Sequence, residues 1–215
     1  MSEIVNEKIE KYIEAHSQAE PKLLQELNKE TWKTVHSPGM LSGHYQGRLL
    51  SMISKLIQPK NILEIGTYTG YSALCMAEGM QSDGKLHTID VNEELFDLQR
   101  RYFDRSDYGE RIIQHVGDAK EIIPNIDASF DLVFIDADKR GYRNYVELVL
   151  PKMNSGGLII SDNVLWKGKA VEESSGKTDK RTESLQAFNI FMNTHPKLET
   201  ILLPIRDGLT LSRVK

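Results

Sequence analysis

From Pro59 onward the chain alternates short apolar runs with amphipathic helical patterns, and this alternation limits its fold more than any other feature. Such alternation is typical of repeated β-α units. We expect strands at 61–65, 85–90, 111–116, 132–136, 157–161, 198–203 and 209–214, and helices at 71–80, 93–103, 142–150 and 183–194 with a short one after residue 119. The middle strands are apolar almost throughout, as in parallel sheets buried on both faces. The last two have no room between them for a crossover helix, so they must form an antiparallel hairpin.

The first 58 residues carry helical patterns and no strand pattern. Apolar side chains recur at helical spacing around Ile9, Leu24 and Leu50. We therefore expect an N-terminal helical extension over 1–58 and one α/β domain over 59–215. The stretch 167–182, rich in Lys, Glu, Ser and Gly, is predicted to be a mobile surface loop.

Charge and cysteine content exclude several protein classes. The chain has 27 basic and 31 acidic residues, a formal net charge of −4, which gives no general attraction to nucleic acid or anionic membranes. The single cysteine, Cys75, excludes an internal disulfide and a cysteine-rich zinc site. No segment approaches the roughly 20 apolar residues of a membrane helix, and the first thirty residues do not resemble a signal peptide. We therefore expect a cytoplasmic protein with no membrane partner.

A glycine turn follows the first predicted strand, where open α/β sheets bind their ligands. The turn contains Gly66 and Gly70 but lacks the G-x-G-x-x-G spacing of pyrophosphate-binding folds. A ligand without phosphates, such as S-adenosylmethionine, needs only a close backbone approach at Gly66 and a carboxylate nearby. Glu64, just before the turn, suits an indirect or water-mediated contact with the amino acid end of that ligand.

The ends of the next two predicted strands also carry acidic residues. Asp90 can accept hydrogen bonds from both ribose hydroxyls of a nucleoside, and its alternative function is a helix N-cap. Asp118 and Ala119 follow Gly117 at a position that can meet an adenine, although Gly-Asp is also ordinary turn chemistry.

The fourth and fifth predicted strands end in Asp136 and in Asp162-Asn163. If these strands are parallel neighbours, the three side chains converge at the edge that carries the glycine turn. Carboxylate and amide oxygens form a hard ligand set that favours Mg²⁺, Ca²⁺ or Mn²⁺. Such a cation would ionise a bound phenol or catechol hydroxyl, and Lys139 could act as general base beside it. The alternative is that these are solvated turn residues and a surface lysine, and we leave Asp138 out of the ligand set.

Taken together, these segments resemble the metal-dependent class I S-adenosylmethionine O-methyltransferases, the group of the caffeoyl-CoA and catechol O-methyltransferases. The matching segments follow the family's order: MLS at 40–42, EIGTYTGYS at 64–72, ID at 89–90, GDA at 117–119, FIDADK at 134–139, SDNVLWKG at 161–168 and DGLT at 207–210. The resemblance implies a Rossmann-like seven-stranded sheet with a reversed last strand, and commonly a homodimer. It also implies that the extension over 1–58 caps the acceptor and cofactor entrance and can supply dimer contacts.

The resemblance also implies functions for individual residues. Metal ligation would fall to Asp136, Asp162 and Asn163, and Lys139 and Asp136 would be catalytic. Cofactor contacts would fall to Met40, Ser42, Glu64, Gly66, Tyr68, Ser72, Asp90, Asp118, Ala119 and Asp136. The expected reaction is methyl transfer from S-adenosylmethionine to a hydroxyl of a catechol-like or other phenolic small molecule, with Mg²⁺ or another divalent cation.

The acceptor cannot be carried over, because the plant enzymes have an acidic pair where this chain reads GHYQG at 43–47. His44 either contacts an acceptor or has a structural hydrogen bond, and Trp166 either forms an aromatic wall or packs in the core. The 167–182 loop and Arg206 could also shape the pocket.

Three rival functions remain open from the sequence. A hydroxylated base in transfer RNA could be methylated by the same chemistry, if a basic face is built from Lys139, Arg140, Arg143, Lys167, Lys169, Lys177, Lys180 and Arg181. A phosphoryl-transfer enzyme would need a phosphate cradle that the glycine turn does not supply. A nucleoside-binding regulatory module would need no metal.

Overall fold

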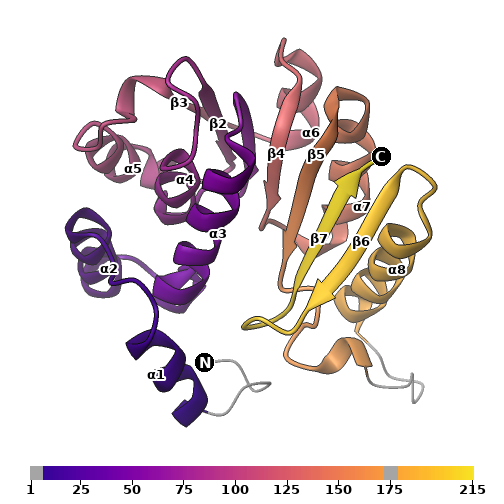
Figure 1. Ribbon diagram of the computed structural model, residues 1–215, viewed down its shortest axis with the longest axis horizontal. Helices are drawn as coiled ribbons and strands as arrows, with labels where there is room; N and C mark the ends of the chain where they lie inside the picture. Colours follow the sequence, from indigo (N-terminus) through magenta and orange to yellow (C-terminus); the bar gives the residue numbers. More distant parts are fainter. Residues whose placement is uncertain (1–6, 172–178) are drawn as a thin grey trace.

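The structure is a computed structural model that describes residues 7–171 and 179–215, and this described part contains a seven-stranded mixed sheet. Its strands are β1 (Asn61–Ile65), β2 (Lys85–Asp90), β3 (Ile112–Val116), β4 (Phe130–Ile135), β5 (Met153–Asp162), β6 (Leu198–Leu203) and β7 (Leu209–Val214). Their order is β3-β2-β1-β4-β5-β7-β6, and of these strands β7 alone runs against its neighbours (Figure 1). The predicted α/β sheet with a reversed last strand and a closing hairpin is therefore confirmed.

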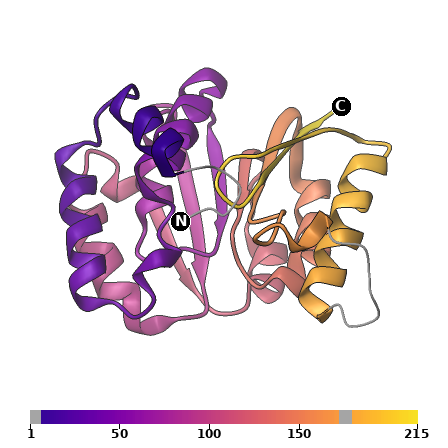
Figure 2. The same cartoon turned by 90° about the horizontal axis from the view of Figure 1, so that it is seen from below.

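Helices cover both faces of this sheet, as predicted. They are α1 (Glu7–Ala15), α2 (Lys22–Thr34), α3 (Gly43–Ile57), α4 (Tyr71–Ala77), α5 (Phe96–Phe103), α6 (Ala119–Ile122), α7 (Tyr142–Val149) and α8 (Lys180–Thr194). Successive side chains of a strand point to opposite faces. Ile62 of β1 therefore joins one core cluster, with residues of α2 to α5, and Leu63 joins a second, with residues of α6 to α8. Figure 2 shows the N-terminal helices and α8 at opposite sides of the molecule.

The N-terminal helices share the core of the sheet. Leu27 of α2 and Leu50 of α3 are fully buried in the first core cluster, the one that contains Ile62 of β1. The Thr31 hydroxyl also donates a hydrogen bond to the Thr69 hydroxyl in the glycine turn, at 3.3 Å. The extension therefore reaches the predicted ligand edge. Across residues 7–171 and 179–215, no helix is both long and apolar enough to cross a membrane.

Several predicted boundaries were wrong by a few residues. β5 begins at Met153 rather than 157, because Met153 pairs with Phe130 before a register shift. α8 begins at Lys180 rather than 183, because the Asp179 carboxylate accepts hydrogen bonds from the next backbone amides and caps the helix. The strand predicted over 132–136 is β4, which ends at Ile135.

Three predicted helices and the loop also differ. The helix predicted over 71–80 ends at 77, that over 142–150 ends at 149, and that over 93–103 divides into a 3-10 turn (Glu93–Leu95) and α5. The predicted loop contains a 3-10 turn (Lys169–Val171), and its residues 172–178 lie outside the described residues.

Candidate active site

The predicted ligand edge lies where β1 and β4 are neighbours although they are far apart in the chain. The connections from these two strands lead to opposite sides of the sheet, and such a switch point is where open α/β sheets bind ligands. Gly66 begins the turn after β1 with a φ of +98°. A Cβ at Gly66 would stand 2.0 Å from the Asp136 carbonyl oxygen. Glycine is therefore required here by the approach of the two strand ends as well as by the turn.

Asp90 organises this glycine turn. Its Oδ2 accepts hydrogen bonds from the backbone amides of Thr67 at 3.0 Å and Tyr68 at 2.7 Å, and its Oδ1 accepts one from the amide of Asn92. The helix-capping function that was the alternative for Asp90 belongs instead to Asn92, whose side chain accepts from the amide of Glu94. The ribose contact of Asp90 stays a prediction.

Glu64 is completely buried beneath the turn. Its two carboxyl oxygens accept hydrogen bonds from the hydroxyls of Ser72 and Thr88, each at 2.5 Å. Burial raises the pKa of Glu64 to about 8, so the carboxyl is largely protonated at neutral pH. A group without exposed surface can act on a ligand only indirectly, which is the type of contact predicted for Glu64.

The predicted cofactor entrance is the segment that precedes α3. Met40 is 61% exposed, whereas Ser42 is buried. The Tyr68 hydroxyl bonds the carbonyl oxygens of His36 and Ser37, and Arg206 donates a hydrogen bond to the Ser42 carbonyl oxygen. The segment is thus fastened at both ends.

The end of β3 shows mainly turn chemistry. Asp118 accepts a hydrogen bond from the amide of Lys120 and caps α6, and Ala119 is buried behind it. Their contact with an adenine stays a prediction.

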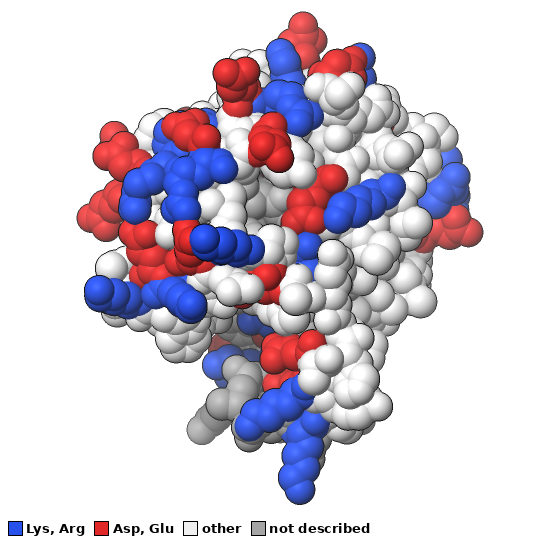
Figure 3. Space-filling view, turned by 60° about the vertical axis from the view of Figure 1, so that its left-hand side comes forward, with Lys and Arg blue, Asp and Glu red and all other residues white. Residues whose placement is uncertain are grey.

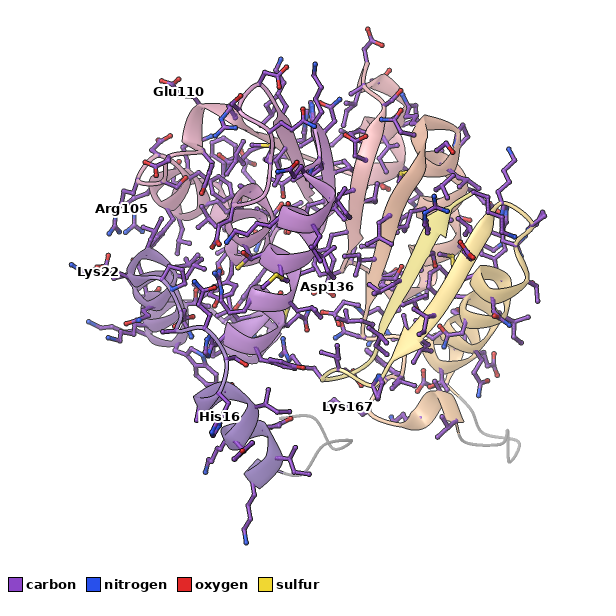
Figure 4. All side chains as sticks on the ribbon, viewed as in Figure 1. His16, Lys22, Arg105, Glu110, Asp136 and Lys167 are labelled. Atoms are coloured by element: carbon purple, nitrogen blue, oxygen red, sulfur yellow. The ribbon has the colours of Figure 1, made fainter. Side chains whose placement is uncertain are left out.

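The second acidic group lies beside the glycine turn, at the ends of β4 and β5. These strands are parallel, with Ile135 opposite Ser161, so Asp136 and Asp162 follow at the same edge. Figure 4 labels Asp136 at this edge. Asp162 is 2% exposed, and burial together with the negative charge of Asp136 raises its pKa above the usual range of an aspartate. The structure thus brings together the carboxylates that the sequence predicted to converge.

Asn163 completes this oxygen-rich cluster. Its backbone amide and its Nδ2 both donate to Asp162 Oδ1, at 2.6 and 3.2 Å. Because the amide nitrogen donates to Asp162, the carbonyl oxygen is the atom of this side chain that would ligate a cation. Its backbone φ of +57° is one that asparagine tolerates better than most residues.

These residues fit a hard divalent cation. Two carboxylates at the ends of adjacent strands repel one another, and a positive ion between them offsets this repulsion. The described residues contain no group of three or more His, Cys, Asp or Glu side chains able to hold a metal. Two carboxylates and one amide would therefore need water or acceptor oxygens as further ligands, which is usual for Mg²⁺.

Lys139 is almost buried in the same region. Its Nζ donates to Asp136 Oδ1 at 2.8 Å and to the Tyr142 hydroxyl at 2.7 Å. The Tyr142 hydroxyl in turn donates to the Asp162 carbonyl oxygen at 2.9 Å. Burial holds the pKa of Tyr142 well above its usual range, so it remains a neutral hydrogen-bonding group. Lys139 here neutralises Asp136, and its function as a base stays a prediction.

Sequence reasoning missed two buried polar residues, Gln46 and Tyr142. The Gln46 amide donates to Asp162 Oδ2 at 2.6 Å. Its only sequence signal is a polar residue on the buried face of an amphipathic helix, and that of Tyr142 is its position three residues after Lys139. Asp138 pairs with Arg140 at the surface, which agrees with leaving it out of the ligand set.

Two residues with open alternatives now have structural contacts. His44 Nε2 lies 2.6 Å from the Gln18 carbonyl oxygen, the structural hydrogen bond considered for it. Trp166 packs against the second core cluster and also borders a cavity of about 400 Å³. The remaining lining residues are basic or acidic: Arg140, Lys169, Asp179, Lys180 and Arg181.

Comparison with known proteins identifies the class of this site. A family model described as O-methyltransferase matches residues 14–215. The chain belongs to the O-methyltransferase family. It is therefore an enzyme, and the predicted methyl transfer to oxygen is confirmed.

Curated relatives of this O-methyltransferase include plant enzymes. Caffeoyl-CoA O-methyltransferase of Petroselinum crispum is 33% identical over 204 residues, covering 90% of this chain and 84% of the relative. Caffeoyl-CoA O-methyltransferase 1 of Eucalyptus globulus is 34% identical over 203 residues, covering 90% and 82%. The O-methyltransferase is thus of the caffeoyl-CoA O-methyltransferase type.

Solved structures agree with this assignment. The methyltransferase of Podospora anserina, bound to SAH, has a TM-score of 0.88 and 28% identity, covering 98% of this chain and 97% of that one. The O-methyltransferase of Bacillus cereus, also in complex with SAH, has a TM-score of 0.88 and 26% identity, covering 97% of each chain. These neighbours support S-adenosylmethionine as the methyl donor of this O-methyltransferase.

Proposed function

We propose that this enzyme transfers a methyl group from S-adenosylmethionine to a hydroxyl of a catechol-like or other phenolic small molecule held by a divalent cation, Mg²⁺ by preference. The observation that carries the proposal is the position of Asp136, Asp162 and Asn163 at the ends of adjacent parallel strands, beside the glycine turn. When bound there, a divalent cation supplies the positive charge that favours ionisation of an acceptor hydroxyl.

The chain's own residues supply position and a proton site. Asp136 lies beside the turn, since its main-chain carbonyl oxygen approaches Gly66. Lys139 stands between Asp136 and Tyr142 and donates a hydrogen bond to each. To act as the base it would first release a proton to solvent, and its neutral amine would then take the hydroxyl proton. The ionised oxygen then forms a bond to the methyl carbon while the carbon–sulfur bond of the sulfonium breaks. Much of the rate would come from holding both reactants in line.

The donor would be bound by the residues around the turn and its entrance. We assign this function to Met40, Ser42, Glu64, Gly66, Tyr68, Ser72, Asp90, Asp118, Ala119 and Asp136. Glu64 and Ser72 would act from below the turn, because the Ser72 hydroxyl is already bonded to the buried Glu64.

The acceptor would combine an aromatic ring with a negative group. Trp166 offers an aromatic ring at a cavity that Arg140, Lys180 and Arg181 also line, and these three residues offer positive charge. A 3,4-dihydroxybenzoate is therefore expected to have a higher kcat/KM than unsubstituted catechol. The same basic residues keep a hydroxylated base in transfer RNA as the second candidate, although Lys177 of the proposed basic face lies outside the described residues.

The experiment that tests the reaction is transfer of labelled methyl from S-adenosylmethionine, with Mg²⁺ or with excess chelator, to pools of phenols and to unmodified or hydroxylated transfer RNA. We expect transfer to phenols that chelation abolishes. Transfer to RNA alone would replace the acceptor by the second candidate, and undiminished transfer under chelation would contradict the metal mechanism.

Asp162→Asn is the sharpest variant, because it keeps the shape of the side chain and removes its charge. We expect at least a ~100-fold loss of kcat, with SAH affinity, measured by calorimetry in the absence of divalent cations, changed less than about three-fold. Asp138→Ala is the matched control, since Asp138 pairs with Arg140 at the surface, and it should keep wild-type activity. Equal losses of turnover and SAH affinity in Asp162→Asn would mean that the metal and donor sites are wrongly divided.

Lys139→Ala tests the base. The rate should fall more at low pH than at high pH, because hydroxide can replace a missing base as the pH rises. A pH-independent loss in the kcat profile would restrict Lys139 to holding Asp136 in place.

A further inference from the structure

We infer that Gln46 and Arg206 form a positioning relay, which holds the carboxylate of Asp162 in the orientation that a cation needs and links it to the segment before α3. The inference rests on the proposed function of Asp162 as a metal ligand. In this relay the Arg206 guanidinium donates to the Ser42 carbonyl oxygen and to the Gln46 carboxamide oxygen. The Gln46 carboxamide nitrogen in turn donates to the Asp162 carboxylate.

Gln46 is a fully buried side chain on α3. Its Nε2 donates to Asp162 Oδ2 at 2.6 Å, and its Oε1 accepts from Arg206 Nη1 at 3.4 Å. A carboxylate requires a donor and a guanidinium requires an acceptor, so only one orientation of the carboxamide satisfies both neighbours. Neither leucine nor glutamate of similar size can do so.

Arg206 enters from the turn between β6 and β7, where its own φ is +49°. This turn is fixed against the segment that follows Asn163: the Val164 amide donates to the Gly208 carbonyl oxygen, and the Leu165 amide donates to the Asp207 carbonyl oxygen. Arg206 is therefore held in place independently of Gln46. It can impose an orientation on Gln46 as well as complement its charge.

Asp162 is held on every side by this arrangement. Gln46 bonds Oδ2, Asn163 bonds Oδ1, and the Tyr142 hydroxyl bonds the main-chain carbonyl oxygen. A carboxylate whose plane is already set meets a cation without losing rotational freedom, and partners that orient a metal ligand commonly change metal affinity by 10- to 100-fold. Without Gln46, Oδ2 would be buried with no partner from α3.

The relay also reaches the proposed donor entrance. Arg206 Nη1 donates to the Ser42 carbonyl oxygen as well as to Gln46. Movement of residue 42 on donor binding would therefore be transmitted to Asp162 through a single guanidinium. Donor and cation should each bind more tightly in the presence of the other, and linkage requires the two factors to be equal.

The test is direct binding of Mn²⁺, followed by the electron paramagnetic resonance signal of the free ion, with and without SAH. Gln46→Leu should weaken Mn²⁺ binding by ~10-fold or more. Arg206→Met should weaken it by less and abolish the effect of SAH on Mn²⁺ affinity, with Arg206→Lys restoring part of that effect. Gln114→Leu is the matched control, because Gln114 is a part-buried glutamine on β3 that bonds Gln99 rather than the metal cluster. It should bind Mn²⁺ as the wild type does.

The outcomes separate this inference from the proposed function. Wild-type Mn²⁺ affinity in both Gln46→Leu and Arg206→Met would overturn the relay and leave the metal mechanism standing. Failure of the wild-type protein to bind Mn²⁺ at all would overturn both. If Gln46→Leu does not fold, as judged by circular dichroism, Arg206→Met decides alone, because its side chain comes from a surface turn.

Discussion

Glu64 is a carboxyl that is costly to bury and that lies directly below the proposed donor site. It is the buried acidic side chain closest in sequence to the glycine turn, and it receives two short hydrogen bonds from Ser72 and Thr88. Those bonds lower its pKa, but burial outweighs them and raises it to about 8. A neutral carboxyl therefore lies below the proposed donor site until a cationic group approaches it.

Glu64→Gln should remove a pH dependence of stability. Between pH values of about 4.5 and 8 the unfolded chain ionises this carboxyl while the folded protein keeps the proton, so the free energy of unfolding falls as the pH rises through this window. Glutamine has no such titration. Relative to the wild type, the variant should therefore gain roughly 2–4 kcal/mol between pH ~5 and pH ~9.

Urea unfolding of both proteins at the two pH values measures this gain. Parallel pH profiles of the wild type and Glu64→Gln would show that Glu64 is already ionised in the folded state.

At the scale of secondary structure, the decisive contact is that between the ends of β1 and β4. The Asp136 amide donates to the Ile65 carbonyl oxygen at 2.9 Å, and the Gly66 amide donates to the Ile89 carbonyl oxygen at 2.9 Å. The ends of β2, β1 and β4 are thus tied together at the edge where the proposed catalytic groups gather. A shift of the glycine turn would therefore also move Asp136.

Gly66→Ala should disrupt this edge. The added Cβ would collide with backbone that cannot yield locally, and the residue would also keep a positive φ. We expect a loss of more than about 3 kcal/mol in the free energy of unfolding, together with loss of SAH binding. Gly168→Ala is the control, since Gly168 also has a positive φ but open space around it.

Gly168→Ala should cost only the backbone strain, about 1 kcal/mol. Equal losses in the two variants, measured by urea unfolding, would mean that strain alone accounts for Gly66.

At the scale of the whole molecule, α2 connects the N-terminal extension to the sheet domain through charge. Glu30 accepts from Arg101 and from the Tyr102 hydroxyl, each at 2.7 Å, and Glu26 pairs with Arg105. Figure 3 shows acidic and basic side chains interleaved over this face rather than gathered by sign. Such a face has no uniformly positive surface for a nucleic acid backbone.

The homodimer that the resemblance implies is a proposal for an apolar surface of α3. On α3, Met52 is 55% exposed and Leu56 is 78% exposed, although both are apolar. A second copy of the chain would cover them, and the sedimentation mass should then be close to twice 24.5 kDa. Leu56→Glu should shift the protein toward the monomer.

Ile190→Glu is the matched control for the dimer, because Ile190 is a similarly exposed apolar residue on α8. It should leave the mass unchanged. A wild-type mass near 24.5 kDa would contradict the dimer, and an effect of Ile190→Glu alone would move the interface to α8.

The expected cytoplasmic location also stays a prediction.

The sequence by itself determined the order of strands and helices, the closing hairpin and the acidic strand ends. These features depend on neighbours in the chain: the spacing of apolar residues, a short connection, or a carboxylate that directly follows a buried strand. The parallel pairing of β4 and β5 then brought Asp136 and Asp162 together as predicted, because residues at equivalent ends of adjacent strands must meet.

Only the tertiary structure decided which polar groups those carboxylates meet. Gln46 and Asp162 are 116 residues apart in the chain, and Arg206 and Ser42 are 164 apart, so no local pattern could indicate their contacts. The same holds for Gly66, whose need to be glycine comes partly from the Asp136 backbone on another strand. Hydrogen-bond partners of buried groups are selected by packing across the whole fold, whereas periodicity records only which side of an element is buried.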